Sequence, residues 1–178
     1  MRKSILMPVV AILLAAAVLL GLSYGLSEVK AQIHHTKLQE KMLFILPGST
    51  SFEEEEYLGE DANIVSVYKA ENGYVILTQT NGYADTISLL VGVTNEGIVT
   101  GLQIRDMHET WGLGGESWTD WKFLNQFPGT DGSAEVGVNI DAITGATVTS
   151  KAVARCVNSA VAFVTGADTD SGATSWGG

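Results

Sequence analysis

An uncharged apolar run from Ile5 to Leu22 is the feature that most limits what this chain can be. At about 1.5 Å per helical residue, the run comes close to the thickness of the hydrocarbon core of a bilayer. Cleaved signal peptides have a shorter apolar region of about 7–15 residues and a small-x-small cleavage site, and neither is clear here. We therefore favour a transmembrane anchor over residues 1–26, with a signal peptide as the alternative.

The charges around this run predict how the anchor is oriented. Arg2 and Lys3 precede the run, whereas Glu28 and Lys30 follow it. The positive-inside rule then places the N-terminus in the cytoplasm. We expect a single-pass protein of the cytoplasmic (inner) membrane whose remaining residues form an extracytoplasmic domain.

The composition after the anchor excludes several classes of protein. Without Arg2 and Lys3, eight basic and twenty acidic residues remain, a net charge of −12. Such a surface repels phosphate backbones, so nucleic acid is not an expected partner, while a basic protein partner remains open. Cys156 is the single cysteine of the chain, so an internal disulfide and a thiolate metal cluster are both excluded.

The chain beyond the anchor divides into three predicted parts. Apolar residues spaced three to five apart predict a juxtamembrane helix from Ser27 to Leu46, ended by Pro47-Gly48, within a segment 27–50. Residues 51–166 form the predicted extracytoplasmic domain. The tail, 167–178, is rich in Gly, Ser, Thr and Asp and is predicted to be flexible.

The pattern within residues 51–166 predicts an α+β fold, an antiparallel sheet of about four strands packed with helices. Runs rich in β-branched and aromatic residues, separated by Asn- and Gly-containing turns, predict the strands. A stripe of small apolar residues predicts the last helix. The predicted strands are 64–68, 74–80, 86–94 and 98–105, and the predicted helices are 120–127 and 148–164. Glu53 to Glu56 are interpreted as a solvated acidic loop, with a docking patch as the alternative.

The most informative segment runs from Asp141 to Ser150, with the sequence Asp-Ala-Ile-Thr-Gly-Ala-Thr-Val-Thr-Ser, at the start of the last predicted helix. A Gly-containing turn into a helix N-terminus offers backbone N–H groups and the positive end of the helix dipole, which together favour a phosphate. The alternative is ordinary helix capping by Thr147, Thr149 or Ser150, which needs no ligand.

The pattern Asp-x-x-Thr-Gly-Ala-Thr resembles the flavinylation motif of FMN-binding domains, which occur in the G subunit of Rnf complexes and in the C subunit of the sodium-pumping NADH:quinone oxidoreductase. In that family a flavin transferase joins FMN through a phosphodiester to the last Thr of the motif. The resemblance implies covalent FMN on Thr147, with Asp141 and Thr144 at the acidic and Ser/Thr positions. It implies further cofactor contacts from Gly145, Ala146 and Thr149.

A second segment supports the resemblance. His108-Glu109-Thr110-Trp111-Gly112-Leu113-Gly114 is similar to the family's His-x-Glu-Thr-Pro-Gly-Leu-Gly loop, which lies by the flavin ring. The resemblance implies cofactor contacts here too, and they fall on Glu109, Thr110, Gly112 and Leu113. The loop departs from the family pattern, since Trp111 replaces Pro and one residue is missing between His and Glu. A plain Gly-rich connection with a buried Trp111 is the alternative.

The resemblance implies an electron-relay subunit of a membrane-bound, ion-translocating ferredoxin:NAD oxidoreductase (Rnf) complex. Such a subunit is part of a redox enzyme without catalytic residues or a metal of its own. Its partners are the other subunits of the complex, the flavin transferase and, through the N-terminal helix, membrane lipid. Two alternatives remain: the FMN subunit of a sodium-pumping NADH:quinone oxidoreductase, and a flavin-free membrane-anchored binding or scaffold module.

Other candidate residues carry weaker signals. The tail repeats the motif as Asp168 to Thr174, but no helix is predicted after Thr174, so Thr147 is the favoured acceptor. His34-His35 lacks further ligands at a recognisable metal spacing, so an interfacial role is favoured over a metal site. Cys156 lies among Val and Ala in the last helix, which is typical of an inert core thiol.

Overall fold

The computed structural model describes residues 36–107 and 120–167. The chain divides into two compact units, Met1–Glu40 and Lys41–Gly178. Within the described ranges, no helix is both long and apolar enough to cross a membrane. The predicted span from Ile5 to Leu22 lies outside the described residues, and the predicted domain boundaries stay predictions.

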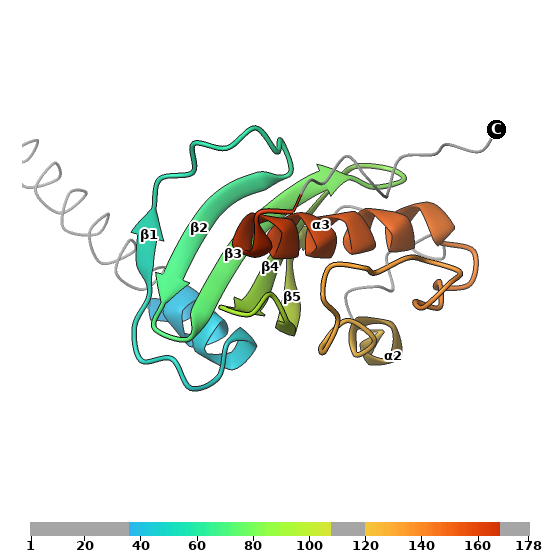
Figure 1. Ribbon diagram of the computed structural model, residues 1–178. Coiled ribbons are helices and arrows are strands. Elements are labelled where there is room, and N and C mark those ends of the chain that lie inside the picture. Colours follow the sequence, from blue (N-terminus) through green and yellow to red (C-terminus); the bar gives the residue numbers. More distant parts are fainter. Residues whose placement is uncertain (1–35, 108–119, 168–178) are drawn as a thin grey trace, which may run out of the picture. The chain divides into compact units, whose positions relative to one another are not determined.

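The second unit is built on a five-stranded antiparallel sheet in which each strand pairs with the next along the chain (Figure 1). The strands are β1 (Glu53–Glu55), β2 (Ile64–Ala70), β3 (Gly73–Asn81), β4 (Thr86–Thr94) and β5 (Val99–Met107). The β3–β4 register is unbroken, whereas β2–β3 and β4–β5 each contain irregularities. The four predicted strands are thus confirmed, with their ends within two residues of the predicted ones.

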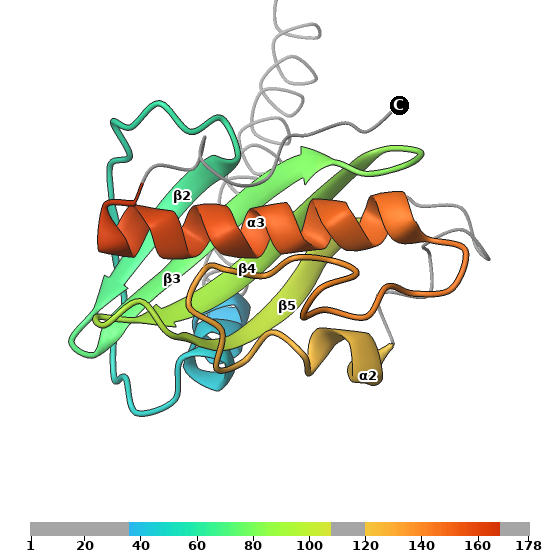
Figure 2. The ribbon, with the colours of Figure 1, turned by 45° about the vertical axis from the view of Figure 1, so that its right-hand side comes forward.

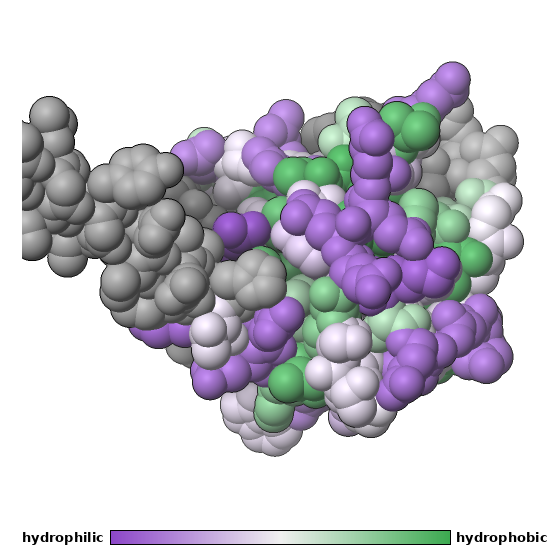
Figure 3. Space-filling model, turned by 90° about the vertical axis from the view of Figure 1, so that its left-hand side faces the viewer, coloured by the Kyte–Doolittle hydropathy of each residue, from purple (hydrophilic) through white to green (hydrophobic). Residues whose placement is uncertain are grey.

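Strand β1 corrects the prediction of an acidic loop. Residues Glu53–Glu55 pair with the outer edge of β2, placing Glu54 opposite Tyr68. All three glutamates are exposed, as expected for a solvated acidic segment. Their backbone is nevertheless extended, because pairing with β2 satisfies the N–H and C=O groups at the edge of that strand. One ion pair joins the strands, between Lys69 Nζ and Glu55 Oε1 at 3.1 Å. Hydrophilic residues cover much of the side that carries β1, with apolar patches between them (Figure 3).

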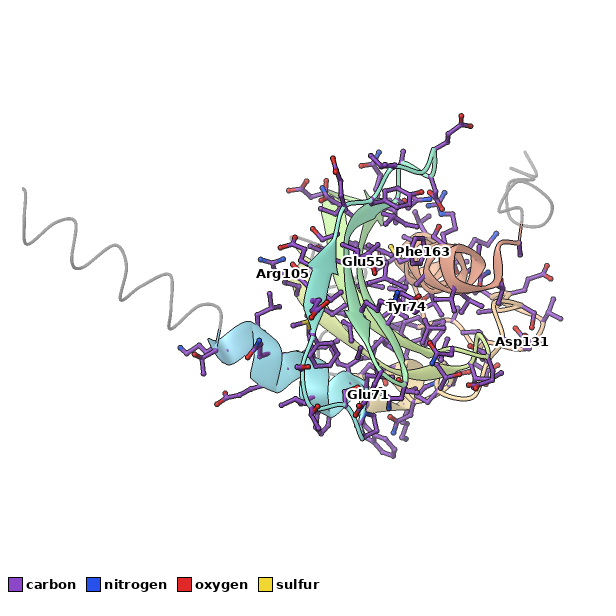
Figure 4. All side chains as sticks on the ribbon, turned by 60° about the vertical axis from the view of Figure 1, so that its left-hand side comes forward. Glu55, Glu71, Tyr74, Arg105, Asp131 and Phe163 are labelled. Carbon is purple, nitrogen blue, oxygen red and sulfur yellow. The ribbon has the colours of Figure 1, made fainter. Side chains whose placement is uncertain are left out.

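Helix α3 (Thr147–Thr165) packs along one face of the sheet (Figure 2). Its buried stripe includes Val153, Cys156, Val157 and Ala160, at the spacing of a helix that packs on one side. The stripe meets strand residues such as Leu89 and forms the main core of the domain with them. Tyr74 reaches the same side of the sheet and contacts Phe163 edge to face, with ring centroids 5.7 Å apart (Figure 4).

Residues 41–45, the part of a helix that belongs to this unit, lie against the face of the sheet opposite α3 (Figure 2). Ile45 is buried, and its carbonyl accepts a hydrogen bond of 2.7 Å from Thr100 Oγ1. The backbone of Ile45 lies over Gly92 and Gly101, which are paired across β4 and β5. A Cβ on Gly92 would lie 2.8 Å from the Ile45 carbonyl oxygen, so the absence of side chains makes this close approach possible. The predicted stop at Pro47-Gly48 is confirmed.

A short helix and a long irregular segment connect β5 to α3. Helix α2 (Trp121–Leu124) begins after Asp120, whose Oδ1 accepts a hydrogen bond of 3.0 Å from Phe123 N–H. It is shorter than the predicted helix 120–127 because the chain turns after Asn125. The segment that follows, 125–146, contains one isolated bridge but no strand or helix, and it brings the chain to the start of α3.

Candidate functional site

The turn before α3 is closed by a backbone hydrogen bond. Ala146 N–H donates to the Ile143 carbonyl at 2.9 Å, and Gly145 adopts a φ of 78°. A positive φ at the third position is the requirement of a type II turn, which explains why Gly stands between Thr144 and Ala146. The sequence Ile-Thr-Gly-Ala therefore has a defined shape at the point where the helix begins.

The N-terminus of α3 has no side-chain cap from the residue that precedes it. The N-cap position is held by Ala146, and Thr147 is the first residue of the helix. The N-cap position is thus held by none of Thr147, Thr149 and Ser150, the residues of the alternative in which ordinary capping explains the motif. The first turn carries the positive end of the helix dipole, and its N–H groups point out of the helix end. This is the arrangement that receives a phosphate.

Ser150 holds the turn against the first turn of the helix. Ile143 N–H donates to Ser150 Oγ at 3.1 Å, and the same hydroxyl donates to the Ala146 carbonyl at 2.9 Å. Ser150 is fully buried, so its bond to the Ala146 carbonyl is shielded from water, whereas the bond from Ile143 N–H is half-buried. The sequence suggested this residue only as a possible cap, whereas the structure shows it as the anchor of the turn.

Gln126 holds the beginning of the same segment. Its side-chain Oε1 accepts from Asp141 N–H at 2.7 Å, and its Nε2 donates to the Asp141 carbonyl at 3.2 Å. The two residues are fifteen positions apart, so the sequence offers no local signal for this contact. A tertiary contact of this kind becomes visible only in the fold.

The FMN-binding domain family matches residues 82–162, which run from the turn between β3 and β4 to the last turn of α3 and include the turn that precedes this helix. The chain is also 33% identical over 175 residues to the G subunit of an ion-translocating oxidoreductase complex of Methanosarcina acetivorans, covering 90% of this chain and 93% of that one. This chain belongs to the family of G subunits of ion-translocating oxidoreductase complexes.

Two further relatives match a shorter stretch. One is the G subunit of the Na⁺-translocating ferredoxin:NAD⁺ oxidoreductase complex of Acetobacterium woodii, 34% identical over 117 residues, 60% of this chain and 53% of the relative. The other is the G subunit of the proton-translocating ferredoxin:NAD⁺ oxidoreductase complex of Clostridium ljungdahlii, 40% identical over 110 residues, 55% of this chain and 59% of the relative. The alignments thus cover little more than half the length of these two proteins.

The structure places one group of the predicted cofactor residues of this G subunit on a single continuous stretch. Asp141, Thr144, Gly145 and Thr147 are exposed along it, so a ligand or an enzyme can reach them. Ala146 and Thr149 are buried and pack beneath the surface. The assignment of all six to the cofactor stays a prediction.

The second group lies outside the described residues. This group consists of Glu109, Thr110, Gly112 and Leu113. His108 and Trp111, which belong to the same loop, also fall outside the described residues. Thr174, the less favoured acceptor in the tail, and the pair His34-His35 also fall outside the described ranges. Within those ranges, no cluster of three or more His, Cys, Asp or Glu is arranged to hold a metal ion.

Cys156 lies on the buried face of α3, next to Thr78 of the sheet. Burial raises the pKa of its thiol to about 12, with a small opposing effect from a hydrogen bond to Thr78. Because the thiolate is the reactive form, a cysteine with this pKa is inert at neutral pH. The prediction of an inert core thiol agrees with this placement.

Proposed function

We propose that this chain is the FMN-carrying electron-relay subunit of a membrane-bound, ion-translocating ferredoxin:NAD oxidoreductase complex, with FMN joined by a phosphodiester to Thr147. The observation that carries the proposal is the exposed residue Thr147 at the first position of a helix whose N-cap is an alanine. The family match across this turn and the name of the Methanosarcina acetivorans relative support it.

The residues present fit an attached phosphate. A phosphodiester on Thr147 stays anionic at neutral pH, and the helix dipole stabilises an anion at this end by roughly 0.3–1 kcal/mol. Ala146 offers no side-chain oxygen that would compete for the first-turn N–H groups. Ser150 holds Ile143 and Ala146, and Gln126 holds Asp141, so side chains fix the backbone that leads to the acceptor.

Attachment requires an activated flavin phosphate, because condensation of FMN itself with a hydroxyl is unfavourable in water. A flavin dinucleotide such as FAD meets this requirement. The bond between Thr147 Oγ1 and phosphorus forms, the pyrophosphate P–O bond breaks with AMP as leaving group, and the hydroxyl proton goes to a base of the transferase. The chain contributes the accessible hydroxyl and a fixed turn.

Bound FMN passes electrons one or two at a time, and the protein holds it and places it near the next carrier. We propose that the predicted anchor at residues 1–26 keeps this domain at the extracytoplasmic side of the cytoplasmic membrane. A covalent bond there prevents loss of a cofactor that the cell cannot readily replace. The other subunits of the complex would donate and accept the electrons, and the net charge of −12 beyond the anchor favours basic surfaces on them.

Covalent flavin tests the proposal directly. The chain is co-expressed with a flavin transferase, denatured and separated on a gel, and flavin fluorescence is compared between wild type, Thr147→Ala and Thr174→Ala. We expect fluorescence in wild type and Thr174→Ala and none in Thr147→Ala. Thr147→Ser is the matched control, because it keeps a hydroxyl at the same position. A wild-type chain without fluorescence, or a fluorescent Thr147→Ala, would overturn the proposed linkage.

A further inference from the structure

The side-chain amide of Gln126 makes two hydrogen bonds to the backbone of one residue, Asp141. Asp141 N–H donates to Gln126 Oε1 at 2.7 Å, and Gln126 Nε2 donates to the Asp141 carbonyl at 3.2 Å. This is the pairing that a neighbouring strand would provide, supplied here by a side chain. Two bonds fix both the position and the rotation of the backbone, whereas a single bond leaves it free to turn.

The backbone that carries Gln126 is itself firmly held. Phe123 and Phe127 on either side of it are buried in the main core, and their rings meet edge to face with centroids 5.3 Å apart. Gln126 Nε2 also lies 3.4 Å from the Phe123 carbonyl. The amide therefore extends from a rigid support rather than from a loose loop.

Asp141, in contrast, has little support of its own. Its side chain is exposed, and it lies in a segment without a strand or helix, six residues before Thr147. In such a segment the direction of a side chain follows the orientation of the backbone. The Gln126 bonds thus determine which way the exposed Asp141 carboxylate leaves the surface.

We propose that Gln126 is a positioning residue for covalent flavin attachment, which holds Asp141 in the orientation that a flavin transferase engages. The proposal rests on the attachment to Thr147 proposed above. Gln126 needs no contact with Thr147 or with the donor flavin for this role. It acts only through Asp141.

The chain contains a matched control for this contact. Asn158, on α3, makes the same pair of hydrogen bonds to the backbone of Ala134. Its Oδ1 accepts from Ala134 N–H at 3.1 Å, and its Nδ2 donates to the Ala134 carbonyl at 2.9 Å. In both cases an amide side chain makes two hydrogen bonds to the backbone of one residue of the irregular segment 125–146. Only the Gln126 pair of hydrogen bonds holds a residue of the acceptor motif. Comparing the two pairs therefore distinguishes an effect on the stability of the segment from an effect on the position of the motif.

The test compares Gln126→Met with Asn158→Leu in the full chain, made without flavin and purified in detergent. Each variant keeps the approximate shape of the side chain and loses both hydrogen bonds. Covalent flavin fluorescence is followed over time after addition of FAD and a flavin transferase. Hydrogen exchange of the peptide covering residues 141–146 and the thermal melting temperature are measured on the same samples. Asn158→Asp, which keeps the acceptor, replaces Asn158→Leu if the latter does not fold.

We expect Gln126→Met to load flavin about tenfold more slowly than wild type, since small errors in placement are costly in a transfer reaction. Exchange of residues 141–146 should quicken in the same variant. Asn158→Leu should load at close to the wild-type rate even if its melting temperature falls as far. Wild-type loading by Gln126→Met, or unchanged exchange, would overturn the inference while leaving attachment intact. The inference would also be overturned if both variants loaded flavin more slowly in proportion to the fall in their melting temperatures. Failure of the wild type to load would instead overturn the proposed function and this inference with it.

Discussion

Ile143 N–H donates to the hydroxyl of Ser150, seven residues later, and that hydroxyl in turn donates to the Ala146 carbonyl. One fully buried side chain therefore satisfies a donor and an acceptor of the turn that presents Thr147. The turn is built from within the helix that it precedes. Its shape is consequently tied to the folding of α3.

Replacing Ser150 with Ala should destabilise the domain by about 1–3 kcal/mol, because the half-buried Ile143 N–H loses its acceptor and the buried Ala146 carbonyl loses a donor. Urea unfolding of the full chain in detergent measures the loss. Ser159→Ala is the matched control, since this buried serine on the same helix accepts one bond of 3.2 Å from Asn63 Nδ2. An equal loss in both variants would contradict the role of Ser150 as the anchor of the turn.

Gly92→Ala should destabilise the domain by about 1–3 kcal/mol through overpacking. The new Cβ would lie 2.6 Å from Thr100 Oγ1 and 2.8 Å from the Ile45 carbonyl oxygen, which are themselves hydrogen-bonded. Gly101→Ala should cost less, because its Cβ would lie 3.2 Å from the same carbonyl oxygen. Urea unfolding compares the two. The reverse order would show that the end of the helix at Ile45 shifts freely on the sheet.

Asp120→Ala should cost about 1 kcal/mol, because the carboxylate that accepts from Phe123 N–H caps α2. Asp120→Asn keeps an acceptor at the same place and should lose much less. The free energy of unfolding in urea measures both. If the two substitutions proved equally destabilising, the charge of Asp120 and not its hydrogen bond would be the stabilising factor.

Cys156 predicts how stability changes at high pH. Burial raises the pKa of its thiol from the ordinary 9.0 to about 12, so its contribution to stability is complete below about pH 9. Between these values the unfolded thiol ionises while the folded thiol stays protonated, so stability falls with pH by up to about 1.4 kcal/mol per unit.

The test for Cys156 compares the free energy of unfolding of wild type and Cys156→Ala at pH 8 and pH 10.5. The other titrating groups are shared, so the difference in slope isolates the thiol. The wild type should lose more stability over this range. Parallel slopes would show that the folded thiol ionises as readily as the unfolded one.

Much of the fold is predictable from the sequence because its strands are strongly patterned. β4, for example, alternates Ile87, Leu89 and Val91 toward α3, and Asn- and Gly-containing turns mark the strand ends. Strand β1 is not predictable in this way, since three consecutive glutamates have no strand preference. Its extended backbone follows from the open edge of β2, which is a property of the sheet.

The candidate site also has a part that the sequence predicts and a part that it does not. The motif from Asp141 to Thr147 and its position at a helix N-terminus follow from the sequence, and the predicted family is confirmed. The contact from Gln126 is not predictable, because it joins residues fifteen positions apart through a glutamine that has no motif of its own. The segment 125–146 carries no periodicity, so its shape depends on side-chain amides rather than on a pattern of apolar residues.

The close contact of Ile45 with Gly92 and Gly101 limits how the sequence of this domain can evolve. A larger residue at position 92 meets the carbonyl oxygen and Cγ2 of Ile45 at once, so it can be accepted only together with a shift of the helix end. The three positions thus behave as one heritable unit: a substitution that is harmful alone becomes tolerable when its counterpart has already changed. Drift at this contact should therefore proceed by paired replacements, and chimaeras that exchange the helix between distant relatives should fold only when both strand positions are exchanged with it.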